Sequence, residues 1–171
     1  LRFRTMLAGV LAAAVLVGAP AAQAGAPPAP SPQDPFRARV VYVSDGDTFG
    51  IRSRKRGTVP VRIIGVDTPE TKRPDAPVEC YGRQATRKLR SMIDGTVVTL
   101  AYQRERRDRF GRDLLDVWTE SGRFVAGTLV GKGFGRELSI WPNTRYQPYL
   151  ERAEKRARSR DRGLWSQCSH G

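Results

Sequence analysis

The sequence predicts a mainly β protein in which about five strands close a small β-barrel and about three α-helices flank it. Short runs rich in Val, Ile and Thr recur between turn residues, as is typical of β-strands. One helical pattern lies between the third and fourth of these runs, and the others follow the fifth. Periodicity alone does not separate such a barrel from other small folds that mix helices and strands.

The expected strands are separated by residues that favour turns. The Asp45–Gly46 dipeptide, which is favoured in tight hairpins, stands between the first two runs. A basic turn at 54–57 precedes the third run, and a proline-rich loop at 67–79 follows it. A charged loop at 104–112 precedes the last run. The strands are expected at residues 37–44, 48–52, 58–66, 96–103 and 113–118.

Helical spacing predicts three helices. Residues 82–93 repeat apolar side chains at helical intervals, and residues 125–132 form a shorter segment before a glycine. Pro148 opens the last helix at a position where its missing N–H costs nothing, and Gly163 ends it. Trp165 and its apolar neighbour are then expected to fold back onto the core.

The first residues carry the pattern of a secretory signal peptide. A basic start with Arg2 and Arg4 precedes an apolar run at 6–19, and the small residues that end at Ala24 fit signal-peptidase cleavage. The run is short for a membrane-spanning helix, although an uncleaved membrane anchor remains the alternative. We expect a signal peptide at 1–24, a Pro- and Ala-rich leader at 25–35 and one folded domain at 36–171.

The chain is strongly basic, with 30 Lys and Arg against 17 Asp and Glu and a net charge of +13. A small domain of this charge needs a polyanion or an anionic surface as its partner. No later segment is apolar enough to cross a bilayer, so we expect a soluble, secreted mature chain, with a monomer as the default. Charge predicts a class of partner and no reaction.

Two cysteines, Cys80 and Cys168, form an even pair, which in an oxidising compartment predicts one disulfide bond. Two free or intermolecular thiols remain the alternative. Two cysteines and one histidine are too few for a zinc or redox site.

Three short segments hold charged residues where a predicted strand ends. They are Asp-Gly-Asp-Thr at 45–48, Arg-Ile-Ile-Gly-Val-Asp-Thr-Pro-Glu-Thr at 62–71 and Asp-Arg-Phe-Gly-Arg at 108–112. Taken singly, each is more simply explained as a turn, a solvated strand face or a soluble loop. Together they supply what phosphodiester cleavage needs. Two aspartates can hold a hard cation, a third carboxylate can accept a proton from water, and two arginines can stabilise charge on phosphate.

These segments resemble the staphylococcal nuclease (thermonuclease) family. The resemblance covers roughly residues 36–165, with the run 62–71 as its most specific part, and it includes the Tyr81–Gly82 step and the closing Gly-Leu-Trp. It implies a five-stranded OB-fold barrel. It also implies a calcium-dependent endonuclease that cleaves DNA and RNA with low sequence specificity and leaves 3′-phosphate ends.

The resemblance implies roles for individual residues. Asp47 and Asp67 match ligands of Ca²⁺, together with the backbone carbonyl of Thr68, and Glu70 matches the general base. So few protein ligands give a weak metal affinity, which suits the high calcium concentration outside cells.

Arg62 and Arg112 match the pair that holds the scissile phosphate in this family. However, Arg62 and Asp67 are five residues apart, and side chains alternate between the two faces of a strand. One unbroken strand would therefore point them to opposite faces. Both line one site only if the strand bulges or ends between them, and Gly65 is the expected position.

Other residues are expected to border the substrate. Lys72 and Arg73 lie in the loop beside the general base, where a solvated loop is the simpler explanation, and Arg109 lies within the third charged segment. Where the family has two tyrosines beside the nucleotide base, residues 138–142 read Leu-Ser-Ile-Trp-Pro. Trp141 could stack on a base or pack in the core.

Three functions are compatible with these sequence features. The first is a secreted calcium-dependent nuclease. The second is a non-catalytic nucleic-acid-binding module on the same barrel, which is weakened because no position of the catalytic set is replaced. The third is a basic surface protein that binds acidic polymers or membranes, with steep salt dependence and no cleavage. The preference between DNA and RNA stays open.

Overall fold

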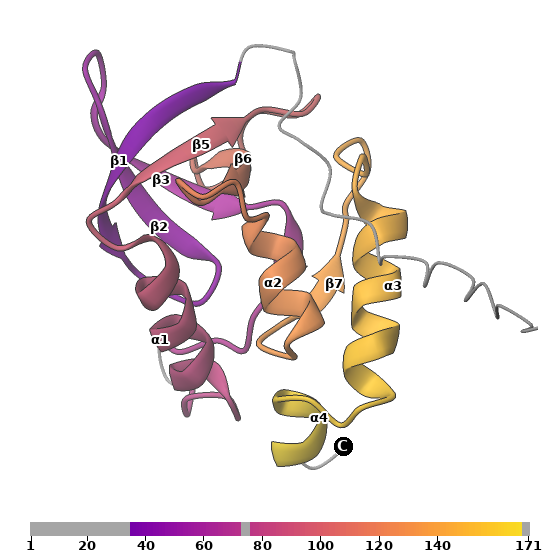
Figure 1. Ribbon diagram of the computed structural model, residues 1–171. Helices are drawn as coiled ribbons and strands as arrows, with labels where there is room; N and C mark the ends of the chain where they lie inside the picture. The colour runs from indigo at the N-terminus through magenta and orange to yellow at the C-terminus, as the bar shows by residue number, and fades with distance from the viewer. Residues whose placement is uncertain (1–34, 73–75, 169–171) are drawn as a thin grey trace, which may run out of the picture.

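A computed structural model describes residues 35–72 and 76–168, and its centre is a closed β-barrel of five strands (Figure 1). The predicted barrel is confirmed, and its strands follow the order β1, β2, β3, β6 and β5. β3 and β6 run parallel, while the other neighbouring strands are antiparallel. The barrel strands are β1 (Phe36–Val43), β2 (Thr48–Ser53), β3 (Gly57–Ile63), β5 (Val97–Ala101) and β6 (Asp113–Trp118).

β1 closes the barrel because its two halves pair with different neighbours. Its first half, from Phe36 to Arg39, pairs with β5, and its second half, from Val40 to Val43, pairs with β2. A register shift between Val40 and Tyr42 lies in the second half, where a bulge bends a strand and increases its twist. One strand therefore belongs to both sheets, and the common core contains Val40 and Val43, with Phe36 and Ala38 packed against it.

The predicted third strand, 58–66, is divided in the structure. β3 ends at Ile63, and a separate strand β4 (Gly65–Asp67) leaves the barrel to pair with β7 (Arg136–Leu138). Gly65 has a φ of 80°, a left-handed conformation that glycine adopts at little cost. The expected break at Gly65 is confirmed. The sequence-based prediction lacks β7 because three residues are too few to show a periodic pattern.

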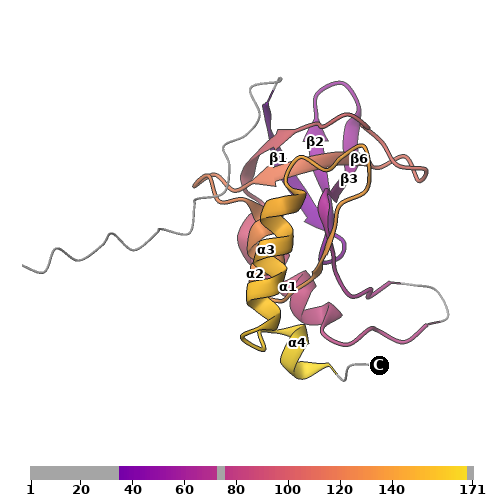
Figure 2. The same cartoon turned by 90° about the vertical axis from the view of Figure 1, so that its right-hand side faces the viewer.

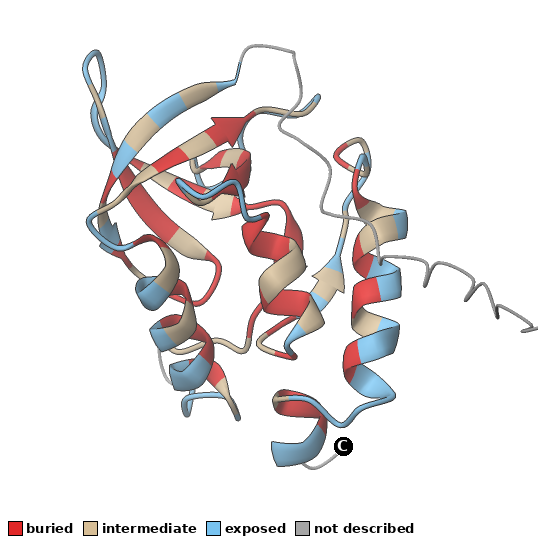
Figure 3. Cartoon of the chain, viewed as in Figure 1, coloured by how far each residue is buried: buried red, intermediate tan, exposed pale blue. Residues whose placement is uncertain are grey.

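Within the described ranges, four helices gather at one end of the barrel (Figure 1, Figure 2). Buried residues lie on the inward faces of the helices, whereas the outer faces of α1 and α3 are exposed (Figure 3). The burial spacing on α1, at Ala85, Leu89 and Ile93, is the helical pattern seen in the sequence. The helices are α1 (Gly82–Ile93), α2 (Val125–Gly131), α3 (Gln147–Arg158) and α4 (Leu164–Gln167). No helix in this part of the chain is both long and apolar enough to cross a membrane.

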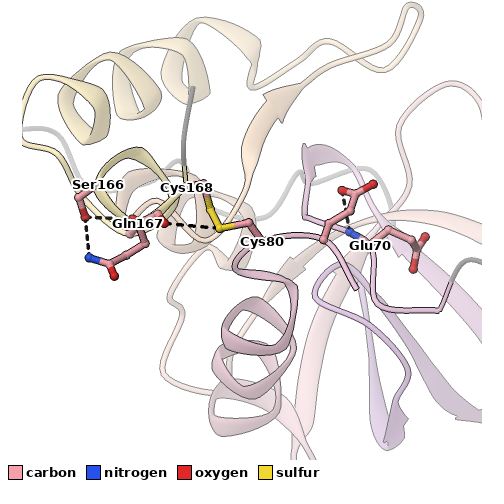
Figure 4. The surroundings of a disulfide bond; sticks show 7 residues. Glu70, Cys80, Ser166, Gln167 and Cys168 are labelled. Atoms are coloured by element: carbon pink, nitrogen blue, oxygen red, sulfur yellow. Dashed lines mark hydrogen bonds between the residues drawn. A yellow bond between two sulfur atoms is a disulfide. The ribbon is translucent and has the colours of Figure 1, made fainter. Parts of the chain in front are cut away.

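The predicted disulfide between Cys80 and Cys168 is present (Figure 4). It ties the end of α4 to the segment that precedes α1. Beside it, Leu164 and Trp165 fold back as expected and pack with Tyr81 in a second, smaller hydrophobic cluster. The C-terminal segment is thus held both by a covalent bond and by buried apolar surface.

Asp116 on β6 is a buried carboxyl group, and its burial disfavours the charged form. Its side chain is 1% exposed, and both its oxygens accept hydrogen bonds from the amide of Gln103. Burial raises the pKa of Asp116 to about 7, although Gln103 and the charge of Arg145 act in the opposite direction. The folded protein therefore holds this proton at pH values where the unfolded chain has lost it.

This pKa predicts a stability that falls as the pH rises. Because the folded pKa is raised, the contribution of Asp116 is complete below its ordinary pKa and is lost as the pH rises to about 7. Loss of this contribution between pH 5 and pH 8 should lower the free energy of unfolding by about 2 to 3 kcal/mol. Urea unfolding of Asp116→Asn should lack this share of the pH dependence, while the exposed control Asp94→Asn should keep it. The same slope in Asp116→Asn and the unmodified protein would contradict the assignment.

Candidate active site

The residues predicted for catalysis lie where β2 begins, where β3 and β4 meet and where the chain enters β6. Asp47 ends the turn before β2, and Arg62 sits on β3 opposite Thr48 of β2. Asp67 ends β4. Arg112 directly precedes β6, which pairs with β3 beside Arg62. Segments that are far apart in the sequence therefore meet on one side of the barrel.

Arg62 joins the two predicted metal ligands. Its Nη2 donates to Asp67 Oδ1 at 2.8 Å, and its Nη1 lies 3.3 Å from Asp47 Oδ2. Nη1 also donates to the backbone carbonyl of Val66 at 2.6 Å, which fixes the guanidinium over β4. The break at Gly65 makes this possible, because the chain turns before Asp67 and brings it to the side of Arg62.

Asp47 is the central acceptor of the site and is 7% exposed. Its Oδ2 accepts hydrogen bonds from both the N–H and the hydroxyl of Thr68, each at 2.9 Å. Its Oδ1 accepts a hydrogen bond from the hydroxyl of Thr48 at 3.0 Å. Three donors besides Arg62 therefore hold the carboxylate in place.

Arg112 is oriented by a residue four positions before it. Asp108 accepts hydrogen bonds from the Nε of Arg112 at 2.6 Å and from its backbone N–H at 3.0 Å. Nη1 of Arg112 lies 3.4 Å from the hydroxyl of Thr48, which in turn donates to Asp47. A continuous chain of polar contacts thus runs from Arg112 through Thr48 and Asp47 to Arg62. No role is predicted for Thr48 or Asp108 from the sequence, although both lie within the quoted motifs.

Asp45 links segments that surround the site, and no role is predicted for it from the sequence. Its carboxylate accepts hydrogen bonds from the hydroxyl of Thr71 at 2.9 Å and from the hydroxyl of Thr86 on α1 at 3.1 Å. It therefore ties the turn before β2 to the loop after β4 and to the first helix. Gly46 permits this close packing, because a Cβ there would lie 2.6 Å from the hydroxyl oxygen of Thr68.

Glu70 lies in the loop after β4, close to the predicted metal ligands in sequence. Its Oε1 accepts hydrogen bonds from the backbone N–H groups of Thr71 and Lys72, each at 2.9 Å. The pKa of Glu70 is raised, mainly by a hydrogen bond with Asp45 and to a smaller extent by burial. The hydrogen bond from the backbone N–H of Lys72 lowers this pKa but does not cancel the shift. Among the described residues, no hydrogen bond or ion pair joins Glu70 to Arg62 or Arg112.

Asp45 and Glu70 form a carboxyl pair whose two pKa values move apart. Burial raises the pKa of Asp45, but hydrogen bonds from Glu70, Gly46 and Thr71 outweigh it and leave that pKa below its ordinary value. Glu70 thus holds a proton more readily than an ordinary glutamate. A carboxyl with a raised pKa is closer to the pH range in which a general base works best.

The side chains of Asp47 and Asp67 suit a hard cation. Both carboxylates already face one cationic group, the guanidinium of Arg62. Burial raises the pKa of Asp67, Arg62 lowers it and the charge of Asp47 raises it again, so the two carboxylates repel each other. Oxygen donors of this kind fit Ca²⁺ or Mg²⁺. In the described part of the chain, no group of three or more His, Cys, Asp or Glu side chains could hold a metal ion.

A pocket of about 380 Å³ opens beside the two arginines, and we call it the catalytic pocket after these two predicted catalytic residues. Arg62 and Arg112 line it, and three exposed apolar side chains contribute to its wall. These are Phe110, Leu138 and Ile140. The pocket combines apolar surface for a base or sugar with cations for a phosphate.

The remaining predicted substrate residues have separate positions. Arg109 lines the catalytic pocket, with its guanidinium 4.8 Å from the ring centre of Phe110. Lys72 is exposed, and its Nζ donates to the hydroxyl of Ser44 at 3.3 Å. Trp141 is 78% exposed, so the core-packing alternative is wrong. The prediction for Arg73 lies outside the described residues.

Known proteins with similar sequences include several nucleases. The sequence profile of a family described as "Staphylococcal nuclease homologue" matches residues 60–167. A thermonuclease of Staphylococcus hyicus is 36% identical over 128 residues, which cover 75% of each chain. An uncharacterized endonuclease of Escherichia coli O157:H7 is 35% identical over 130 residues, which cover 75% of this chain and 76% of the relative. Endonuclease YncB of Bacillus subtilis (strain 168) is 34% identical over 129 residues, which cover 74% of this chain and 60% of the relative.

Proposed function

Because this chain belongs to the staphylococcal nuclease homologue family, we propose that it is a calcium-dependent endonuclease that hydrolyses phosphodiester bonds of DNA and RNA. The nuclease class rests on relatives that are named as a thermonuclease and as endonucleases. One structural observation supports the reaction most directly. Arg62 and Arg112 line a single pocket and are joined through Thr48 and Asp47 in a fixed network.

In the proposed reaction the two arginines bind the scissile phosphate. Their guanidinium groups donate hydrogen bonds to its oxygens and stabilise the additional negative charge of the five-coordinate transition state. The contacts of Arg62 with Asp67 and with the carbonyl of Val66, and the contact of Arg112 with Asp108, hold both groups in place before substrate binds. Little reorganisation is then needed during the reaction.

Glu70 is proposed to act as the general base. It accepts a proton from a water molecule whose oxygen attacks phosphorus. The bond between phosphorus and the 5′ oxygen breaks, and that oxygen takes a proton from solvent, which leaves a 3′-phosphate and a 5′-hydroxyl. A calcium ion, when bound, would supply positive charge to the phosphate and to the attacking water. Asp47, Asp67 and the backbone carbonyl of Thr68 would hold it, with water and substrate oxygens as the remaining ligands.

Several further properties are part of this proposal. We propose that residues 1–24 are a signal peptide, that 25–35 form a leader and that the nuclease domain spans 36–171 as a secreted monomer. The disulfide between Cys80 and Cys168 supports an oxidising compartment. Lys72, Arg73, Arg109 and Trp141 are proposed to contact nucleic acid outside the catalytic set.

Cleavage of an end-labelled oligonucleotide by the purified protein tests the proposal. We expect cutting in calcium that stops when a chelator is added, because two carboxylates alone bind the metal weakly. The new ends should resist polymerase extension until a phosphatase removes the 3′-phosphate.

Two other results would point elsewhere. Tight binding of the oligonucleotide without cutting at any calcium concentration would indicate a non-catalytic nucleic-acid-binding module. Equal binding of nucleic acid and other polyanions, again without cutting, would indicate a basic surface protein.

A further inference from the structure

A second hollow of about 490 Å³ lies beside the catalytic pocket, and we call it the tryptophan hollow. It is lined by Gln103, Arg104, Trp141, Pro142, Thr144 and Arg145. The two hollows are neighbours along both chain segments that form them. Glu105 and Ile140 line the catalytic pocket, whereas the adjacent Arg104 and Trp141 line the tryptophan hollow.

Asn143 fixes the wall between the two hollows. It is 4% exposed, and its Oδ1 accepts the backbone N–H groups of Arg104 and Glu105, each at 3.0 Å. Its Nδ2 donates to the carbonyl of Glu105 at 2.9 Å. Three hydrogen bonds from one buried side chain therefore join the 104–105 segment to the 140–143 segment. The linings of the two hollows therefore adjoin at this wall.

The base of the tryptophan hollow is anchored to the core. Gln103 accepts the backbone N–H of Arg145 through its Oε1 at 3.1 Å and donates through its Nε2 to buried Asp116. These contacts hold the 103–104 segment and the 144–145 segment together at fixed positions. Arg104 and Arg145 are both exposed, so their positive charges border the hollow at its rim.

Trp141 presents an exposed indole on this rigid wall. It is 78% exposed, whereas the other two tryptophans, Trp118 and Trp165, are 1% and 4% exposed. Aromatic rings flanked by arginines are the usual means by which proteins bind single-stranded nucleic acid, because every base can stack and every nucleotide carries a phosphate. An acidic lining would repel a phosphate, and no acidic side chain lines this hollow among the described residues.

We propose that the tryptophan hollow is a second nucleotide subsite for single-stranded substrate, in which a base stacks on Trp141 while Arg104 and Arg145 bind the adjoining phosphate. The inference rests on the proposed function, since the strand that fills this subsite continues from the catalytic pocket. In this proposal, the tryptophan hollow binds the nucleotides that lie next to the cleaved one.

Kinetics on two substrates test the subsite. A mononucleotide aryl phosphodiester has no second base, whereas a single strand of about ten nucleotides can fill both hollows. Trp141→Ala should raise KM for the single strand about tenfold, because one stacked base is lost, and should leave kinetics on the mononucleotide unchanged. Trp141→Phe should recover part of the affinity. An unchanged KM for the single strand, or an equal loss on both substrates, would overturn the proposal.

Salt dependence tests the arginines separately. Removal of one phosphate contact from a single strand lowers the slope of log binding constant against log salt by about 0.7. We expect this change in Arg104→Gln and no change in Arg160→Gln, an exposed arginine after α3. Equal slopes in the two variants would remove Arg104 from the subsite.

Fluorescence separates failure of the subsite from failure of the proposed function. In chelator, where no cleavage is expected, a single strand should quench the exposed indole of Trp141, and Trp141→Phe should abolish that quenching. Quenching with no cleavage in calcium would retain the subsite and reject the nuclease. Cleavage without quenching would retain the nuclease and reject the subsite, and quenching only by anionic lipid vesicles would assign this surface to membranes.

Discussion

Glu70→Gln is expected to lower the turnover number for nucleic-acid cleavage by about 10²- to 10⁴-fold, the usual contribution of a general base. The glutamine keeps the size and one acceptor oxygen, so it can still accept the N–H groups of Thr71 and Lys72 that hold Glu70 in place. It cannot accept a proton from water. Because no hydrogen bond or ion pair joins Glu70 to Arg62 or Arg112 in the described residues, binding of the substrate phosphate should remain close to normal, with KM changed by no more than about threefold.

The pH profile gives this experiment a second measurement. The pKa of Glu70 is raised by its hydrogen bond with Asp45, so the acid limb of the rate profile should lie above the ordinary glutamate range. That limb should disappear in Glu70→Gln. A matched control is Glu120→Gln, which removes an exposed carboxylate that pairs with Arg37 on the barrel surface. Turnover that falls equally in both variants, or in neither, would refute the role of Glu70.

Loss of the disulfide is expected to lower the free energy of unfolding by about 4 to 5 kcal/mol, if it acts mainly by restricting the unfolded chain. Cys80 and Cys168 are separated by 88 residues, so the bond closes a loop that spans most of the domain. For a domain of this size the melting temperature should fall by roughly 10 to 20 °C. Thermal unfolding with and without a reductant measures the change.

The cysteine variants provide the control for this measurement. Cys80→Ser combined with Cys168→Ser should unfold at the temperature of the reduced protein and should not respond to the reductant. The buried packing of Leu164 and Trp165 against Tyr81 should keep α4 attached, so a folded state should persist. If reduction leaves the melting temperature of the unmodified protein unchanged, the stabilisation assigned to the bond is wrong.

Most of the barrel can be predicted from the sequence because its strands and helices carry local patterns. The run of Val and Tyr at 40–43 on β1 and the spacing of Leu89 on α1 predict elements that the structure contains. The strand β7 and the division at Gly65 depend on pairing between segments far apart in the chain. A local pattern does not contain that information, although the odd and even positions of Arg62 and Asp67 indicate that a division lies between them, and Gly65 indicates where.

The candidate site shows the same limit. Motifs and a family resemblance predict which groups are present, including Arg62 and Asp47, which the structure brings together. They do not predict the side chains that hold these groups. Asp45 reaches Thr86 across 41 residues, and Asn143 reaches Arg104 across 39, so both roles arise only from tertiary packing.

The break at Gly65 also affects how this protein can change over generations. Any other residue there would have to adopt a φ of 80°, and its Cβ would lie 2.4 Å from Leu150 on α3. The relative placement of Arg62 and Asp67 is therefore linked to the packing of α3 beside Gly65. We expect the pocket walls to diversify freely among descendants, while substitutions at this kink survive only with a compensating change in the helix.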